Sequence, residues 1–161
     1  MACYVNPYTE MQLTRAGDYG VRAMVHLATL PAGSRVSLGN LAEASRAPAA
    51  FLAKVLQRLA AAGLVLSHRG AAGGFQLNAS PSQISLLDVV EAMEGPLQLN
   101  VCTGHAGAPV CDRQTGCAVH CVWMEAQTML RHTLGTATLE SLARKSGISS
   151  EPKVPFADKL S

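Results

Sequence analysis

Residues 48–79, PAAFLAKVLQRLAAAGLVLSHRGAAGGFQLNA, decide the fold of this chain. Their first half predicts an amphipathic helix over residues 48–62, because apolar side chains recur there at i, i+3, i+4 and i+7. These side chains are Leu52, Val55, Leu56 and Leu59. Lys54, Gln57 and Arg58 occupy the opposite face, and Pro48 is expected at the first helical position, where a missing N–H costs nothing. Taken alone, the pattern also fits an ordinary surface helix.

The second half of this stretch predicts a β-hairpin directly after the helix. Gly63 ends the helix, and two strand-like segments, LVLSH and FQLNA, flank a glycine-rich turn. Such a turn lets the backbone approach phosphates, while Arg69, next to Gly70, is able to reach a phosphate or a narrow minor groove. The turn is not a nucleotide-binding loop, because no G-K-[S/T] follows it.

Two further helices are predicted before this stretch. Thr14 is suited to cap a helix that runs to about Leu30, and residues 36–44 predict a short second helix. The segment Ser45-Arg46-Ala47-Pro48 then forms a tight turn into the third helix. A helix, a turn, a basic helix and a wing in this order predict a winged helix-turn-helix domain. The expected fold class is mainly α with a small β-hairpin wing.

The charge distribution agrees with a nucleic-acid partner. The net charge is only +2, but residues 31–75 contain five basic residues and the single acid Glu43. Residues 76–101 contain three acids and no base, so one end of the domain is suited to meet phosphate. No run of about 18 apolar residues predicts a membrane span. The first residues do not resemble an export signal, so we expect a cytoplasmic protein.

Beyond the wing, the pattern predicts a helix from Ile84 to Gly95, with Leu87, Val90 and Met93 inward. Apolar residues at helical spacing from Val119 to Thr133 predict a long helix, too apolar to lie alone, which we interpret as a dimerisation helix. The predicted parts are a loose arm at 1–10 with Met11 as a candidate start, the DNA-binding domain at 11–98, a cysteine loop at 99–118, the dimerisation helix and a short following helix at 119–146, and a disordered tail at 147–161.

The cysteine loop is the candidate site for an inorganic centre. Cys102, Cys111 and Cys117 are spaced C-x8-C-x5-C, and His120 and Cys121 follow directly. A reducing compartment favours metal or redox chemistry over disulfides for such a cluster. We expect Cys117, His120 and Cys121 to share one face at the start of a helix, where the helix dipole favours thiolate.

Two other uses of these cysteines stay open. Three cysteines and one histidine also suit structural zinc, although zinc motifs usually pair ligands only two to four residues apart. In that case zinc, or oxidation of the thiols, would control the binding of DNA. A thiol redox enzyme using Cys117 and Cys121 is the third hypothesis, but no C-x2-C pair supports it, so we do not expect an enzyme.

Several segments in collinear order between residues 11 and 142 resemble the Rrf-two family of bacterial winged-helix regulators. They are MQLTRAGDYGVRAM at 11–24, GLVLSHRGAAGGF at 63–75, ISLLDVVEA at 84–92 and the three-cysteine loop that runs into C-x2-H-x2-W. The resemblance implies a homodimer that binds a palindromic operator on double-stranded DNA. It also implies that an iron-sulfur cluster, 2Fe-2S or 4Fe-4S, sets the operator affinity.

The resemblance carries the cluster ligands over to Cys102, Cys111 and Cys117. The fourth ligand is either His120 or Asp18, depending on the subfamily, and Cys121 is an additional candidate without a counterpart. The expected function is a DNA-binding transcriptional regulator that senses nitric oxide, iron, oxygen or redox state, as a repressor or an activator. The predicted DNA contacts are Ala50, Phe51, Lys54, Gln57, Arg58, Arg69 and Gly70. Because residues 49–53 carry few polar groups, specificity is expected to depend on DNA shape.

Overall fold

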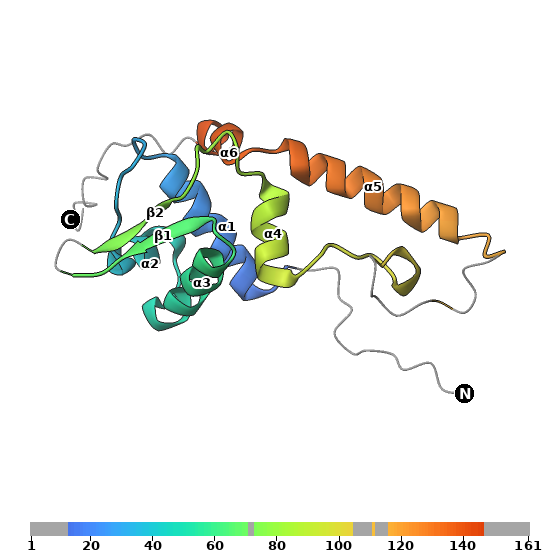
Figure 1. Cartoon of the computed structure of the whole chain (residues 1–161), viewed down its shortest axis with the longest axis horizontal. Coiled ribbons are helices and arrows are strands. Elements are labelled where there is room, and N and C mark those ends of the chain that lie inside the picture. Colours follow the sequence, from blue (N-terminus) through green and yellow to red (C-terminus); the bar gives the residue numbers. More distant parts are fainter. Residues whose placement is uncertain (1–12, 71–72, 105–110, 112–115, 147–161) are drawn as a thin grey trace, which may run out of the picture.

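The computed structural model describes residues 13–70, 73–104, 111 and 116–146. These residues form helices, one 3-10 turn and a two-stranded antiparallel hairpin (Figure 1). The mainly α fold with a small wing is therefore confirmed. The elements are α1 (Arg15–Ala28), α2 (Leu38–Ser45), α3 (Ala49–Ala61), β1 (Val65–His68), β2 (Gly74–Leu77), α4 (Leu86–Glu94), η1 (Val101–Thr103), α5 (His120–Thr136) and α6 (Leu139–Lys145).

Helix α1 is the centre of the core and contacts α2, α3, α4 and α6. Its predicted cap is confirmed, because the Thr14 side chain accepts a hydrogen bond from the Gly17 amide at 3.1 Å. Ala23, Met24 and Leu27 are buried on its inner face. This helix therefore joins α2 and α3 to α4 and α6 in one core.

The predicted start of the second helix at residue 36 is wrong. Helix α2 begins at Leu38 with Ser37 as its N-cap. Val36 instead pairs with Phe75 through two backbone hydrogen bonds of 2.9 and 2.8 Å, and its side chain is buried. Gly74 is needed beside this pairing, because a Cβ there would lie 2.6 Å from the Val36 carbonyl oxygen.

The turn between α2 and α3 is tight, with Arg46 in the left-handed conformation at φ 52°. Pro48 is the N-cap of α3 and not its first helical residue, which corrects the prediction. Its extended backbone lets its carbonyl accept the Leu52 amide at 2.9 Å. The apolar face of α3 is confirmed: Leu52, Val55, Leu56 and Leu59 are all buried.

The wing is confirmed, with β1 and β2 in an antiparallel register from Val65↔Leu77 to His68↔Gly74. Helix α4 starts later than predicted, because Ser85 caps it and forms a capping box with Asp88. Ile84 therefore lies before the helix, although it is buried as expected. Val90 and Met93 are buried, Leu87 is half-buried, and Val89 is an additional core residue.

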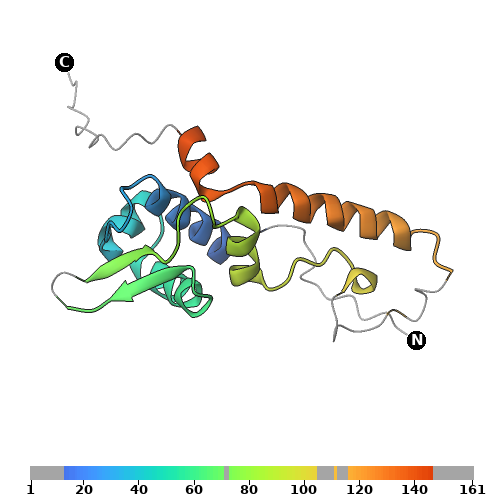
Figure 2. The ribbon, with the colours of Figure 1, turned by 45° about the horizontal axis from the view of Figure 1, so that its top comes forward.

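Helix α5 extends from the domain, and both views show η1 beside its N-terminal half (Figures 1 and 2). The residues that link α5 to α6 are fastened to the start of α4 by hydrogen bonds from Leu86 N to Ala137 O (2.7 Å) and from Leu139 N to Ile84 O (2.9 Å). Leu139 is fully buried in the core. The predicted arm at 1–10 and tail at 147–161 lie outside the described residues.

Within the described ranges, none of the helices combines the length and the apolar character that crossing a membrane requires.

Candidate functional site

The outer face of α3 carries most of the predicted DNA contacts. Ala50, Phe51, Lys54 and Gln57 are all exposed on this helix. The Phe51 ring, 40% exposed, packs edge-to-face on Tyr19 of α1 with ring centroids 5.8 Å apart. This contact orients an aromatic ring at the front of the helix, where few polar groups stand.

Arg58 is placed differently from its neighbours on α3. Its guanidinium donates a hydrogen bond to the main-chain carbonyl of Met93, in the last turn of α4. A positive side chain at the C-terminal end of a helix is favoured by the helix dipole. Its predicted DNA contact stays a prediction, and the structure gives Arg58 an intramolecular partner as well.

The wing adds further positive charge. Arg69 and Gly70 are exposed at the end of β1, and Gly70 has a φ of 97°, which favours glycine. At the other side of the hairpin, Arg35 donates to the Gln76 side chain at 3.4 Å. Arg35 was counted among the basic residues in sequence but not among the DNA contacts. Its hydrogen bond to Gln76 places this cation beside the wing.

The structure does not gather the predicted cluster ligands into one group. Cys102 lies in η1, and Cys102, Cys111 and Cys117 are half-buried free thiols, while Cys121 is an exposed one. Across the described ranges, no three Cys, His, Asp or Glu side chains are close enough to hold one metal ion. Cys117 also precedes α5 and is not part of its first turn, which corrects the expectation of a shared face with His120 and Cys121.

The chemistry of the donor set nevertheless fits an inorganic centre. His120 begins α5, and its Nδ1 atom is buried without a hydrogen-bond partner in the part of the chain that the structure describes. A buried polar nitrogen without a partner is costly, and a metal bond would satisfy it. Val119, the N-cap of α5, supplies no side-chain cap, so the positive helix end is left open near Cys117. Thiolates and an imidazole together suit iron-sulfur clusters and zinc.

Asp18, the alternative fourth ligand, lies in the first turn of α1. Its carboxylate forms an ion pair with Arg22 at 2.8 Å, one turn further along the same helix. Both side chains are about half exposed. Asp18 is therefore accessible, but it already has a local partner.

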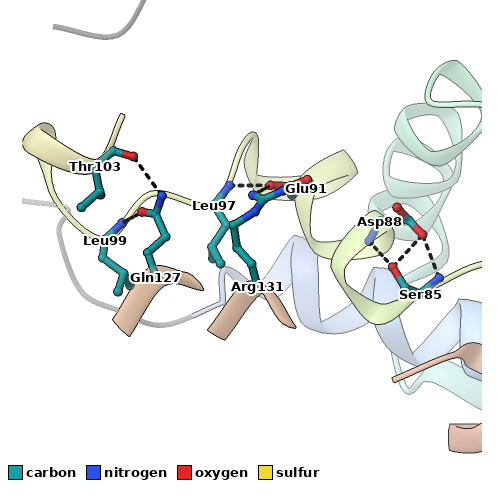
Figure 3. Close-up of polar contacts among 8 residues, drawn as sticks. All are labelled: Ser85, Asp88, Glu91, Leu97, Leu99, Thr103, Gln127 and Arg131. Atoms are coloured by element: carbon teal, nitrogen blue, oxygen red, sulfur yellow. Dashed lines mark hydrogen bonds and ion pairs between the residues drawn. The ribbon is translucent and has the colours of Figure 1, made fainter. Parts of the chain in front are cut away.

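A set of polar side chains that the sequence did not single out fastens η1 to the rest of the molecule (Figure 3). Gln127 of α5 accepts from the Leu99 amide at 3.0 Å and donates to the Thr103 carbonyl at 2.9 Å. One turn further, Arg131 forms an ion pair with Glu91 of α4. Gln127 and Arg131 follow His120 at helical spacing and lie on the half-buried face of α5. This spacing is the sequence signal that could have identified them.

The comparisons with known proteins agree on one family. The Rrf2 family, described as "Iron-dependent Transcriptional regulator", matches residues 13–145. A candidate HTH-type transcriptional regulator of Mycobacterium tuberculosis (strain H37Rv) is 35% identical over 133 residues, covering 83% of this chain and 81% of the relative. The HTH-type transcriptional regulator IscR of Vibrio atlanticus is 31% identical, with 83% and 76% covered.

The solved structures give the same result. The chain superposes with a TM-score of 0.71 and 27% identity on CymR, the global cysteine regulator of B. subtilis, covering 84% of this chain and 98% of that one. These relatives are transcriptional regulators and not enzymes. This chain belongs to the Rrf2 family and is a DNA-binding, winged-helix transcriptional regulator.

Proposed function

We propose that this regulator acts as a cytoplasmic homodimer whose affinity for a palindromic operator depends on an iron-sulfur cluster. Cys102, Cys111 and Cys117 would supply three ligands and His120 the fourth. The observation that carries the proposal is the buried Nδ1 of His120, which has no hydrogen-bond partner among the described residues. His120 follows by three residues the last of three half-buried free thiols. The iron dependence in the description of the family supports it.

When bound, the cluster would supply a centre that iron supply, nitric oxide or oxidants can alter. The protein itself would hold the thiolates near the positive end of α5 and exclude part of the solvent from them. The cysteine segment leads directly into α5, so binding of a centre by these cysteines would affect the position of that helix. The two recognition helices of a dimer would then be set apart differently with and without the bound centre.

The test is to purify the protein without oxygen, record its visible absorbance, and measure iron, sulfide and zinc per chain. Cys111→Ala is compared with Cys121→Ala, which removes an exposed thiol from the same region. We expect iron and sulfide in the wild type and in Cys121→Ala, and neither in Cys111→Ala. Zinc without sulfide in the wild type would refute the cluster and support a zinc-switched regulator.

The same variants test control of DNA binding. The operator is first selected from a random pool of duplexes with the wild-type protein. We expect loss of the bound iron to change operator affinity in the wild type and in Cys121→Ala but not in Cys111→Ala. Equal operator affinity for all three proteins, with and without iron, would contradict control by the cluster. Comparing His120→Ala with Asp18→Ala for the rate of iron loss to a chelator identifies the fourth ligand.

The proposed DNA face is tested separately from the cluster. Arg69→Ala removes an exposed cation at the wing, and Arg144→Ala removes an exposed cation on α6 whose partner is Glu140. Both variants change the net charge equally. We expect only Arg69→Ala to lower the slope of log K against log salt for duplex DNA, by about 1. An equal change in both variants would show that Arg69 acts only through the net charge and would refute its contact with a phosphate.

The proposed dimer interface is the outer face of α5. Val122 and Met129, seven residues apart, are 62% and 64% exposed, and none of the 17 residues of the helix is buried. An apolar face of this kind is suited to a second copy of the chain. Val122→Glu is expected to give a monomer by light scattering, while Thr128→Glu, also exposed on α5, should stay dimeric. A dimeric Val122→Glu would refute this interface.

A further inference from the structure

The turn that carries Cys102 is held in place by the side chain of one residue on another helix. The Gln127 carboxamide lies between the main chain of Leu99 and that of Thr103 (Figure 3). Its Oε1 accepts from the Leu99 amide at 3.0 Å, and its Nε2 donates to the Thr103 carbonyl at 2.9 Å. The two bonded groups stand on either side of Cys102 in sequence, so the carboxamide brackets the cysteine.

Inside this bracket the turn is closely bonded. The Thr103 hydroxyl accepts from the Asn100 amide at 3.1 Å and donates to the Asn100 carbonyl at 2.8 Å. The Asn100 side chain accepts from the Val101 amide at 2.8 Å, and Thr103 is only 4% exposed. The turn is therefore closely bonded in itself, and Gln127 bonds it to α5.

A second contact holds the chain just before this turn. Glu91 of α4 accepts from the Leu97 amide at 2.9 Å, and the same carboxylate pairs with Arg131 of α5. Arg131 follows Gln127 by one helical turn on the same half-buried face of α5. The stretch from Leu97 to Thr103 is thus attached to α5 at two successive turns.

The chemistry at position 127 is specific to glutamine. A carboxamide offers one acceptor and two donors, which matches an amide at one side and a carbonyl at the other. Glutamate at this position would accept from Leu99 but could not donate to Thr103. Alanine would do neither and would leave both main-chain groups to solvent.

We infer that Gln127 is a positioning residue for Cys102: it fixes the turn Leu99–Thr103 on α5 and thereby sets where this thiol stands. The inference rests on the proposed function, in which Cys102 is a cluster ligand. It goes beyond that function because it concerns a residue that binds no metal. Because no metal-sized group of ligands forms among the described residues, the place of Cys102 in this structure follows from the bonds of its turn to Gln127 and not from a bound centre.

The experiment uses the full chain as Gln127→Ala, Gln127→Glu and Gln98→Ala. Gln98 is the matched control, because its side chain donates to the Asn100 carbonyl of the same turn at 2.9 Å and forms no hydrogen bond to α5 among the described residues. Two quantities are measured on metal-free, reduced protein: amide hydrogen exchange at Leu99, and the rate at which iodoacetamide alkylates Cys102. The exposed Cys121 is the internal standard, and circular dichroism checks that each variant is folded.

We expect Gln127→Ala to speed both the exchange and the alkylation about tenfold, the effect of losing one to two net hydrogen bonds. Gln127→Glu should fall between this variant and the wild type, and Gln98→Ala should match the wild type. Unchanged exchange and alkylation in Gln127→Ala, or an equal change in Gln98→Ala, would overturn the inference.

Iron loss to a chelator, followed by visible absorbance, separates this inference from the proposed function. If the wild type binds iron and sulfide, Gln127→Ala should lose them about tenfold faster than Gln98→Ala does, since an unpositioned ligand re-forms its bond more slowly. Equal loss in the two variants would overturn the positioning role. If the wild type binds neither, the proposed function fails, and the exchange and alkylation rates still decide whether Gln127 positions Cys102.

Discussion

Replacing Gly17 by alanine is expected to break the hydrogen bonds between Thr14, the N-cap of α1, and Glu94 at the end of α4. A Cβ at Gly17 would stand 2.3 Å from Oε1 of Glu94, far too close for any real contact. That oxygen accepts two hydrogen bonds from Thr14, from its amide at 3.1 Å and from its hydroxyl at 2.7 Å. Because the carboxylate is the far end of a flexible side chain, it will swing away and lose both bonds.

The size of the effect follows from two opposing terms. Each lost hydrogen bond to the Glu94 carboxylate is worth about 1 to 1.5 kcal/mol at this exposed position. Alanine itself stabilises a helix by about 1 kcal/mol relative to glycine. The free energy of unfolding should therefore fall by about 1 to 2 kcal/mol, although glycine-to-alanine changes in helices normally raise it.

The assay is urea unfolding of the metal-free protein, followed by circular dichroism. Gly39→Ala is the control, because its added Cβ would meet nothing nearer than the Ser37 hydroxyl at 4.0 Å. That variant should be neutral or more stable. In a Glu94→Ala background, Gly17→Ala should become stabilising, since the clash and the bonds are both gone. Equal destabilisation by Gly17→Ala with and without Glu94 would refute this reasoning.

Two further predictions concern the core and the pH dependence. Leu139→Ala should lower the free energy of unfolding by about 3 kcal/mol in urea, because Leu139 is fully buried, whereas the half-buried Leu142→Ala should cost less than half as much. Burial lowers the pKa of His26 below its usual 6.5, so the unfolded chain binds the proton more tightly than the folded one. This part of the stability is present above pH 6.5 and is lost as the pH falls below it. In His26→Gln the urea midpoint should fall less than in the wild type as the pH drops below 6.5; an equal fall in both proteins would exclude His26 as its cause.

The features that sequence patterns predicted correctly are those that depend on neighbours along the chain. The buried face of α3 follows from helical spacing, and Thr14 caps α1 because a hydroxyl next to the first turn is bonded to nearby amides. The wing follows from two short alternating segments around glycines. Each of these depends on residues only a few positions apart.

Two of the boundary errors occur where a distant residue bonds the backbone. Val36 is drawn out of the second helix because Phe75, 39 residues later in the chain, bonds both its amide and its carbonyl. Ile84 precedes α4 because its carbonyl accepts from Leu139 and its neighbour Ser85 caps the helix. Phe75 and Leu139 lie outside any local pattern, and both boundaries moved by two residues. The capping box of Ser85 and Asp88, by contrast, is a local signal that the prediction missed.

The same limit applies to the candidate site. The spacing of Cys102, Cys111 and Cys117 identified thiols that suit a metal or cluster, but it carried no information about which of them is held in place. That information lies in Gln127, whose main-chain partners are 24 to 28 residues away. A polar residue on the inner face of an amphipathic helix indicates that it has a hydrogen-bond partner. It does not indicate where in the chain that partner lies.

The last turn of α4 is where the three parts of this regulator meet. Within four residues, Glu91 pairs with Arg131 of the proposed dimer helix, the Met93 carbonyl accepts from Arg58 of α3, and Glu94 accepts from Thr14, the N-cap of α1. Packed helices transmit a shift as rigid bodies and do not absorb it locally. If the proposed function holds, we expect a change in the segment after α4 to reach α3 through the contacts of Glu91 and Met93. This is the path by which we propose that the position of Cys102 bears on DNA binding without direct contact between them.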